Sequence, residues 1–148
     1  MSDRVPYIRK LERSECLEIL ARNKVGRVAF SVHDRVDIEP IHYVLDGDWL
    51  YLRTSPGSKV ATVAHNRWVA FEVDEFEELF RWRSVVVHGG IYPVSADLSG
   101  VETHEHAIDA LRQLIPDSLT ADDPVPFRNV VLRIHLDEVT GREAEPVG

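Results

Sequence analysis

The stretch that decides the fold lies between residues 36 and 53 and reads VDIEPIHYVLDGDWLYLR. It contains two runs rich in β-branched, aliphatic and aromatic residues, 36–45 and 49–53, which Asp46-Gly47-Asp48 separates. An Asp-Gly pair between two such runs is a strong hairpin signal, because glycine adopts the positive φ that tight turns need. These residues therefore predict two antiparallel strands joined by a tight turn.

Four further runs of similar composition lie on either side of this hairpin, at residues 27–32, 68–74, 82–96 and 129–136. The run at 82–96 is too long for an ordinary strand, and Gly89-Gly90 within it predicts a bulge or a sharp bend. Six strands joined mostly by hairpins indicate a mainly-β fold, in which an antiparallel sheet closes into a small barrel. The sequence lacks the strand–helix alternation of parallel sheets and the Gly-rich dinucleotide turn.

Helices are predicted to flank the barrel, from capping residues and apolar periodicity. The N-terminal helix spans about 11–22 with Ser14 as its N-cap, a short helix spans 58–65, and the C-terminal helix spans about 101–115 after a capping box of Ser99 and Glu102. The strand at about 129–136 is then the last predicted element. No repeat or linker divides the chain, so we expect one domain over residues 1–148.

Composition argues against several classes of protein. The 148 residues are 44% hydrophobic and 28% charged, which is typical of a globular domain. With 25 acidic and 17 basic residues the formal net charge is −8, which disfavours nucleic-acid binding. The single cysteine, Cys16, excludes a disulfide framework and a thiolate zinc cluster within one copy. No apolar run approaches the ~20 residues that span a bilayer, and the N-terminus has no signal-peptide core, so we expect a cytoplasmic protein without membrane contact.

The segment richest in chemistry is Arg53-Thr54-Ser55-Pro56-Gly57-Ser58-Lys59. It ends a predicted strand, opens a predicted helix, and gathers two cations, three hydroxyls and a glycine. Helix N-terminal amides attract anions, and hydroxyls with Arg and Lys complete a phosphate cradle. The glycine spacing is not that of a Walker A loop. A polar turn that caps a helix explains the same residues, and the segment by itself leaves both interpretations open.

Polar residues also interrupt the strand predicted at 36–45. Glu39, His42 and Tyr43 stand among its apolar residues, and Pro40 removes one ladder donor. Either a ligand lies along this strand and uses its backbone, or the strand is an edge with one solvated face. His104 and His106 are two positions apart on a predicted helix and do not face one another, so no metal site is expected.

Several segments together carry a family resemblance, which covers roughly residues 10 to 95. They are GRVAFS (26–31), EPIHY (39–43), LYLRTS (50–55), GSK (57–59), VAFEVD (69–74) and WRSVVVHG (82–89). In this order and at this spacing the chain resembles the pyridoxamine 5′-phosphate oxidase-like FMN-binding split β-barrels, and among them the branch related to nitroimidazole-resistance proteins. A strand ending in Val139-Thr140-Gly141-Arg142 is also similar.

The resemblance implies a six-stranded split-barrel homodimer that holds FMN at each of two subunit interfaces. It implies an FMN-dependent oxidoreductase acting on a small molecule that the sequence does not identify. By the same resemblance, Arg53, Thr54, Ser58 and Lys59 would hold the FMN phosphate; Ile41, His42 and Tyr43 would run beside the isoalloxazine ring; and Trp82 and Ser84 would reach the flavin of the partner subunit.

Two alternatives stay open at this point. Some relatives use the deazaflavin F420, so an F420-dependent reductase on the same fold is one of them. A dimer that binds flavin or haem without turnover is the other. The C-terminal residues that bind substrate phosphate in true pyridoxamine 5′-phosphate oxidases have no counterpart in this sequence, so vitamin B6 oxidase activity is not expected. No catalytic acid or base is assigned.

Overall fold

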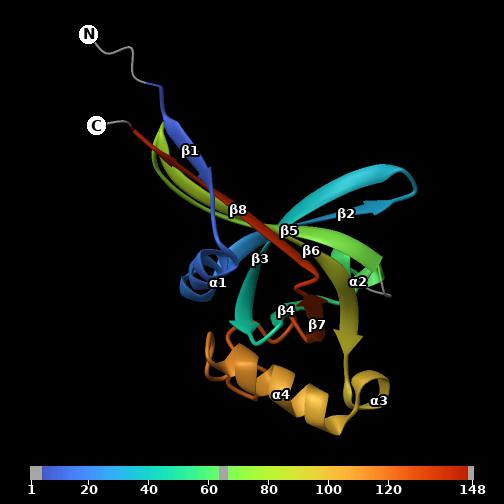
Figure 1. Ribbon diagram of the computed structural model, residues 1–148. Coiled ribbons are helices and arrows are strands. Elements are labelled where there is room, and N and C mark those ends of the chain that lie inside the picture. The colour runs from blue at the N-terminus through green and yellow to red at the C-terminus, as the bar shows by residue number, and fades with distance from the viewer. Residues whose placement is uncertain (1–4, 64–66, 147–148) are drawn as a thin grey trace.

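The computed structural model describes residues 5–63 and 67–146, and its main body is a ring of antiparallel strands (Figure 1). The strands are β1 (Tyr7–Lys10), β2 (Val25–Val32), β3 (Arg35–Asp46), β4 (Trp49–Thr54), β5 (Arg67–Glu78), β6 (Arg81–Val94), β7 (Val130–His135) and β8 (Glu138–Glu145). The helices are α1 (Arg13–Arg22), α2 (Lys59–Val63), α3 (Ala96–Ser99) and α4 (Val101–Arg112). None of the helices in the described residues is long and apolar enough to cross a membrane.

Six of these strands close the barrel. Their spatial order is β6-β5-β2-β3-β4-β7, and β7 pairs back with β6. Every pairing is antiparallel. The mainly-β, six-stranded antiparallel barrel predicted from the sequence is therefore confirmed, and each of the six predicted strands is one of the barrel strands.

The tight turns follow from local backbone chemistry. Gly47 has a φ of +59° at the first position of the two-residue β3–β4 turn, as a type II′ turn requires. His33 and Asp34 both have positive φ in the β2–β3 turn, which is the type I′ pattern. The predicted hairpin at Asp46-Gly47-Asp48 is thus confirmed.

The glycines in β6 have a different role from the predicted bulge. β6 stays in continuous register with β5 through Gly89 and Gly90, so of the predicted bulge or sharp bend, the bulge is wrong. On its other edge, β6 pairs with β8 before these glycines and with β7 after them. A Cβ on Gly89 would lie 1.8 Å from the carbonyl oxygen of His135, so the barrel closes only because this position has no side chain.

Two strands lie outside the ring. β8 pairs with the first half of β6, and β1 pairs with β8, so that these strands and the ends of β5 and β6 form a ribbon that extends away from the barrel (Figure 1). β8 follows β7, so the strand predicted at 129–136 is not the last one. β8 has exposed Glu138, Thr140 and Arg142 at alternate positions and offers little apolar pattern to detect.

The helices differ from the predictions mainly at their ends. α1 begins after Glu12, whose N–H donates to the Glu15 carboxylate at 3.0 Å, so Ser14 is not the N-cap. α4 follows Gly100 and ends at Arg112, and the predicted Ser99 cap is wrong because the Ser99 hydroxyl donates to the Ser95 carbonyl at 2.8 Å. The short helix covers 59–63; Ser58 directly precedes it, and residues 64 and 65 of the predicted 58–65 lie outside the described residues.

The core has two parts. The larger fills the barrel and includes the buried face of α1, with Cys16, Ile19 and Leu20 packed beside Tyr43 and Phe71. The smaller lies between α4 and the outer face of the sheet, where Ala107, Ala110 and Leu111 cover Tyr51 and Val131. The barrel core thus packs on one face of β3 and β4, and α4 packs on the other. The candidate site lies where these strands meet the segment that joins β4 to α2.

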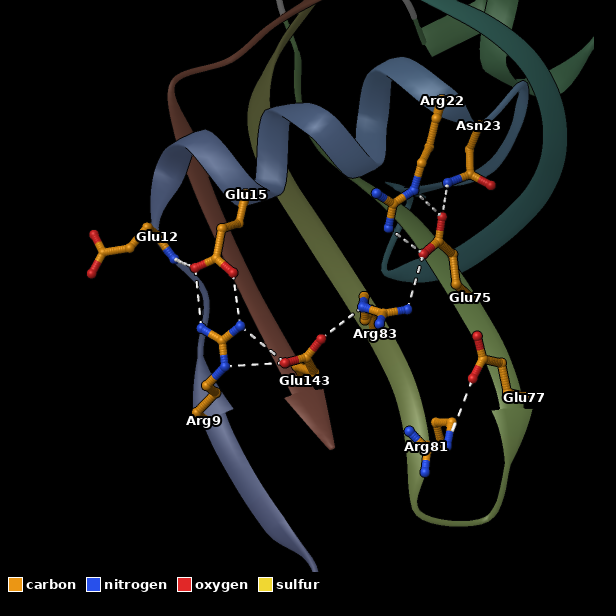
Figure 2. Close-up of polar contacts among 10 residues, drawn as sticks. All are labelled: Arg9, Glu12, Glu15, Arg22, Asn23, Glu75, Glu77, Arg81, Arg83 and Glu143. Carbon is orange, nitrogen blue, oxygen red and sulfur yellow. Dashed lines mark hydrogen bonds and ion pairs between the residues drawn. The ribbon is translucent and has the colours of Figure 1, made fainter. Parts of the chain in front are cut away.

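A chain of ion pairs fastens the ribbon to α1 (Figure 2). Arg9 of β1 binds Glu15 of α1 at 2.7 Å and Glu143 of β8 at 2.9 Å. Glu143 also accepts from Arg83 of β6 at 2.7 Å. Glu75 of β5, 3.6 Å from Arg83, continues the chain to α1, because Arg22 binds it at 2.6 Å and Asn23 donates to it at 2.7 Å.

Candidate functional site

Two adjoining hollows lie on either side of the segment that joins β4 to α2. The larger, about 340 Å³, is called the main groove, and the other, about 290 Å³, the side groove. The main groove is lined by Val25, Glu39, Pro40, Ile41, His42, Arg53, Thr54, Ser55, Phe127 and Arg128. The side groove is lined by Val32, His33, Arg35, Asp37, Gly57, Lys59 and Thr62.

The turn between the two grooves is built by Pro56 and Gly57. The N–H of Ser58 donates to the carbonyl of Ser55 at 3.1 Å, and Gly57 has a φ of +82°, so the four residues fit a type II turn. This turn brings the Ser58 hydroxyl to the start of α2, where it accepts the N–H of Ala61 at 3.1 Å. The Thr54 hydroxyl donates to the same oxygen at 2.9 Å. Thr54 and Ser58 are therefore brought together as predicted, and the Ser58 proton remains available to a ligand.

Lys59 supplies an accessible positive charge beside this turn. Its ammonium lies 3.1 Å from the Asp37 carboxylate of β3, and its side chain is 63% exposed. An exposed ion pair of this kind contributes little stability, so the ammonium can exchange Asp37 for an anionic ligand at little cost.

Arg53 is buried, and its guanidinium binds groups of the loop between α4 and β7. Its Nε donates to the carbonyl of Arg128 at 2.8 Å, and its terminal nitrogens bind the Asp123 carboxylate and, at 3.2 Å, the carbonyl of Val125. This guanidinium, with backbone N–H groups, lowers the pKa of Asp123 to about 2. Four of the five N–H donors of Arg53 are thus used within the chain, so at most one faces a ligand.

The three predicted residues of β3 separate into two groups. Ile41 and His42 line the main groove, with His42 exposed and Ile41 half-buried. Tyr43 is fully buried in the barrel, its ring edge-on to Phe71, and its hydroxyl donates to the carbonyl of Leu20 at 2.6 Å. Burial raises the pKa of Tyr43. The structure therefore does not bring the Tyr43 side chain to the groove.

Trp82 and Ser84 lie on the ribbon and line neither groove of this chain. Trp82 is half-buried opposite Phe76, and the hydroxyl of Ser84 donates to Glu72 at 3.1 Å. Burial also raises the pKa of Glu72. In one chain these residues belong to a different part of the molecule from the 55–59 turn (Figure 1), so the predicted contact with a partner's flavin stays a prediction.

Sequence reasoning missed the third wall of the main groove. Phe127 and Arg128 belong to the loop between α4 and β7, and Asp123 of the same loop binds Arg53. This loop has a proline-rich, polar composition with no periodic pattern. The one available signal is the change to the apolar run of β7 directly after Asn129.

The remaining candidates have structural roles. Cys16 is fully buried, and burial raises the pKa of its thiol. His106 lies 3.4 Å from Asp46 and edge-on to Tyr51. Over residues 5–63 and 67–146, no group of three or more metal-ligating side chains comes together.

Comparison with known proteins supports the architecture described above. The family model described as pyridoxamine 5′-phosphate oxidase matches residues 12–143. The chain belongs to this family. A curated relative, uncharacterized protein RA0666 of Rhizobium meliloti (strain 1021), is 29% identical over 148 residues, covering 93% of this chain and 96% of the relative.

Two solved structures of the family are similar over nearly their whole length. A FAD-binding protein (mll6688) from Mesorhizobium loti is 30% identical, with a TM-score of 0.73 and coverage of 93% of this chain and 99% of that one. A Bacteroides thetaiotaomicron protein proposed as a 5-nitroimidazole antibiotic resistance protein has a TM-score of 0.70 at 17% identity, covering 99% of this chain and 96% of that one. The latter likeness concerns the fold alone.

Proposed function

We propose that the main groove binds the FMN moiety of a flavin nucleotide and that the protein is a flavin-dependent oxidoreductase. The observation that carries the proposal is the junction of two unlike surfaces at the main groove and the side groove beside it. One is the β3 segment from Glu39 to His42, and the other is the hydroxyl-rich turn with its nearby ammonium. A flavin has the same division, with a flat ring at one end and a phosphate at the other. The FAD-binding relative at 30% identity supports the choice of ligand.

The residues present fit such a ligand. Ser58 and Ser55 offer hydroxyls and Lys59 offers a charge to a dianionic phosphate, while Arg53 adds at most one N–H. Ile41 and His42 would lie along the ring, where backbone groups and one imidazole can contact its polar edge. Bound flavin supplies hydride and single-electron transfer. The chain's own contribution is to bind the phosphate, orient the ring and limit access of water.

We further propose that two copies form the functional dimer. The hairpin end of the β5–β6 ribbon exposes three large apolar side chains, Phe76 (68%), Leu79 (70%) and Phe80 (45%). Neighbouring exposed apolar groups of this size favour contact with a partner. Such a contact would give Trp82 and Ser84 the predicted role beside the other subunit's flavin. Light scattering at micromolar concentration should give about twice 16.9 kDa. A monomer that still binds flavin would remove that role.

The absorption spectrum of the purified protein tests the ligand. We expect flavin absorption, and mass spectrometry of the material released by heat should identify FMN or FAD. Protein purified without colour is to be titrated with FMN, FAD and F420. Binding of F420 alone would favour the deazaflavin reductase, and binding of none would refute the proposal.

Turnover is tested on the reduced flavoprotein. Nitroaromatic and quinone acceptors should reoxidise the bound flavin faster than oxygen alone. Equal rates with every acceptor and with oxygen would favour a flavin-binding protein without enzymatic turnover.

A further inference from the structure

The loop between α4 and β7, residues 113–129, forms one wall of the main groove through Phe127 and Arg128. It contains neither helix nor strand and proceeds through successive turns. The last of these turns places the N–H of Arg128 on the carbonyl of Val125 at 3.0 Å. Because the loop has no regular structure of its own, its position beside the groove depends on contacts with the barrel.

Arg53 provides those contacts from the end of β4. Its guanidinium holds two loop carbonyls, those of Val125 and Arg128, and pairs with Asp123. The Asp123 carboxylate in turn accepts the N–H of Leu119 at 2.8 Å and that of Val125 at 3.0 Å. The side chains of Arg53 and Asp123 are only 6% and 1% exposed. A buried pair with this many bonds fixes geometry, since either partner alone would be a costly buried charge.

Arg128 is in the opposite situation. Across the described residues its guanidinium has no carboxylate within 4.0 Å and no hydrogen-bond acceptor, and it lies over the Phe127 ring, 5.9 Å from the ring centroid. It lines both the main groove and a narrow extension of it beside His42 and Arg53. Since Asp123 neutralises Arg53, Arg128 is the unpaired positive charge among the residues that line the main groove.

We propose that Arg128 contacts the phosphate of the bound flavin nucleotide and that Arg53 is a positioning residue, which holds Arg128 at the groove through Asp123. The proposal rests on the flavin binding proposed above. A phosphate has several terminal oxygens and accepts bonds from more than one side, so Arg128 would add to the contacts from the turn, of which Thr54 and Ser55 line the same groove. An unpaired guanidinium that is partly screened from water binds such a dianion strongly and in fixed geometry.

The test compares FMN with riboflavin, which has the same ring and lacks the phosphate. Arg128→Gln should weaken FMN binding by about tenfold or more and leave riboflavin binding unchanged within about twofold. Arg128→Lys keeps the charge and should retain most of the affinity. The slope of log Kd against log salt should be shallower in Arg128→Gln. Arg13→Gln removes an exposed charge outside the groove and is the matched control.

Asp123→Asn separates a positioning role of Arg53 from direct contact of Arg53 with the phosphate, because the two roles predict opposite changes in FMN affinity. If Arg53 positions the loop, Asp123→Asn reduces the preference for FMN over riboflavin to the value found in Arg128→Gln, and the double variant shows no further loss. If Arg53 itself binds the phosphate, freeing it from Asp123 strengthens FMN binding, and that result would overturn its assignment as a positioning residue. Asparagine retains one acceptor oxygen and can keep one of the two loop N–H bonds, and thermal unfolding of the variant checks that it folds.

The outcomes distinguish failure of the proposed flavin binding from failure of the role given to Arg128. Wild-type protein that binds neither FMN nor FAD refutes the proposed function and the role of Arg128 with it. If the wild type binds flavin and Arg128→Gln binds FMN and FAD as tightly as the wild type does, only the role of Arg128 is refuted. Equal loss of FMN and riboflavin in Arg128→Gln also refutes it, since no phosphate contact would then be involved. A loss confined to FAD, with FMN binding unchanged, refutes the contact with the FMN phosphate.

Discussion

Tyr43→Phe tests whether this residue belongs to the barrel core or to the cofactor site. The Tyr43 hydroxyl donates to the carbonyl of Leu20 at 2.6 Å, and both residues are at most 1% exposed. Leu20 lies in the last turn of α1, whose carbonyls have no partner within the helix. Removing the hydroxyl leaves one buried acceptor unsatisfied, which costs about 2 kcal/mol. At this chain length the melting temperature should fall by about 4–8 °C.

The assay is urea unfolding of the wild type and the variant, with flavin titration of the same samples. We expect a lower free energy of unfolding with an unchanged m-value, and an unchanged flavin Kd. Tyr7→Phe is the matched control, because Tyr7 is 59% exposed and should tolerate the change. If Tyr43→Phe is as stable as the wild type and loses flavin affinity, the hydroxyl serves the ligand, and the assignment to the core is refuted.

Three further predictions concern other parts of the molecule. Lys59→Gln should weaken FMN binding about tenfold and leave stability unchanged, as measured by fluorescence titration and thermal unfolding beside the exposed control Lys10→Gln; equal affinity would exclude a phosphate contact. Arg22 lowers the pKa of Glu75 to about 2 from 4.5, so the stability that this pair provides is present above pH 4.5 and is lost as the pH falls toward 2. Glu75→Gln should therefore be less stable than the wild type at pH 7 and similar to it near pH 2, and a difference independent of pH would contradict this. Gly89→Ala should destabilise the barrel by about 1–3 kcal/mol or more, because the new methyl group meets a backbone carbonyl at the end of β7, and unchanged urea unfolding would show that the barrel can adjust there.

The six barrel strands could be predicted because their signals are local. Alternating or continuous apolar runs with Gly at the turns specify strand and hairpin without reference to distant residues, as Gly47 illustrates. β8 gave almost no such signal. It is a strand because β6 and β1 satisfy its backbone on both sides, and these partners come from segments far away in the chain.

In the candidate site, too, features that depend on neighbouring residues could be predicted, and features that depend on distant residues could not. Thr54, Ser58 and Lys59 are close in the chain, so their sequence alone predicted that they would gather at one turn. The sequence also placed Arg53 at the end of a strand beside them. Its side chain, however, is engaged by Asp123, a partner 70 positions away that no local pattern identifies.

Tyr43 shows the limit most clearly. A polar residue in an apolar strand is consistent with a ligand contact, and the sequence offered no means of detecting the Leu20 carbonyl 23 positions earlier that accepts its hydroxyl. By itself, the sequence determined the six barrel strands, the hairpin at Asp46-Gly47-Asp48 and the family. Tertiary structure decided which polar side chains are used within the protein and which, like Arg128, have no bonding partner among the described residues, because that division depends on partners that only folding brings together.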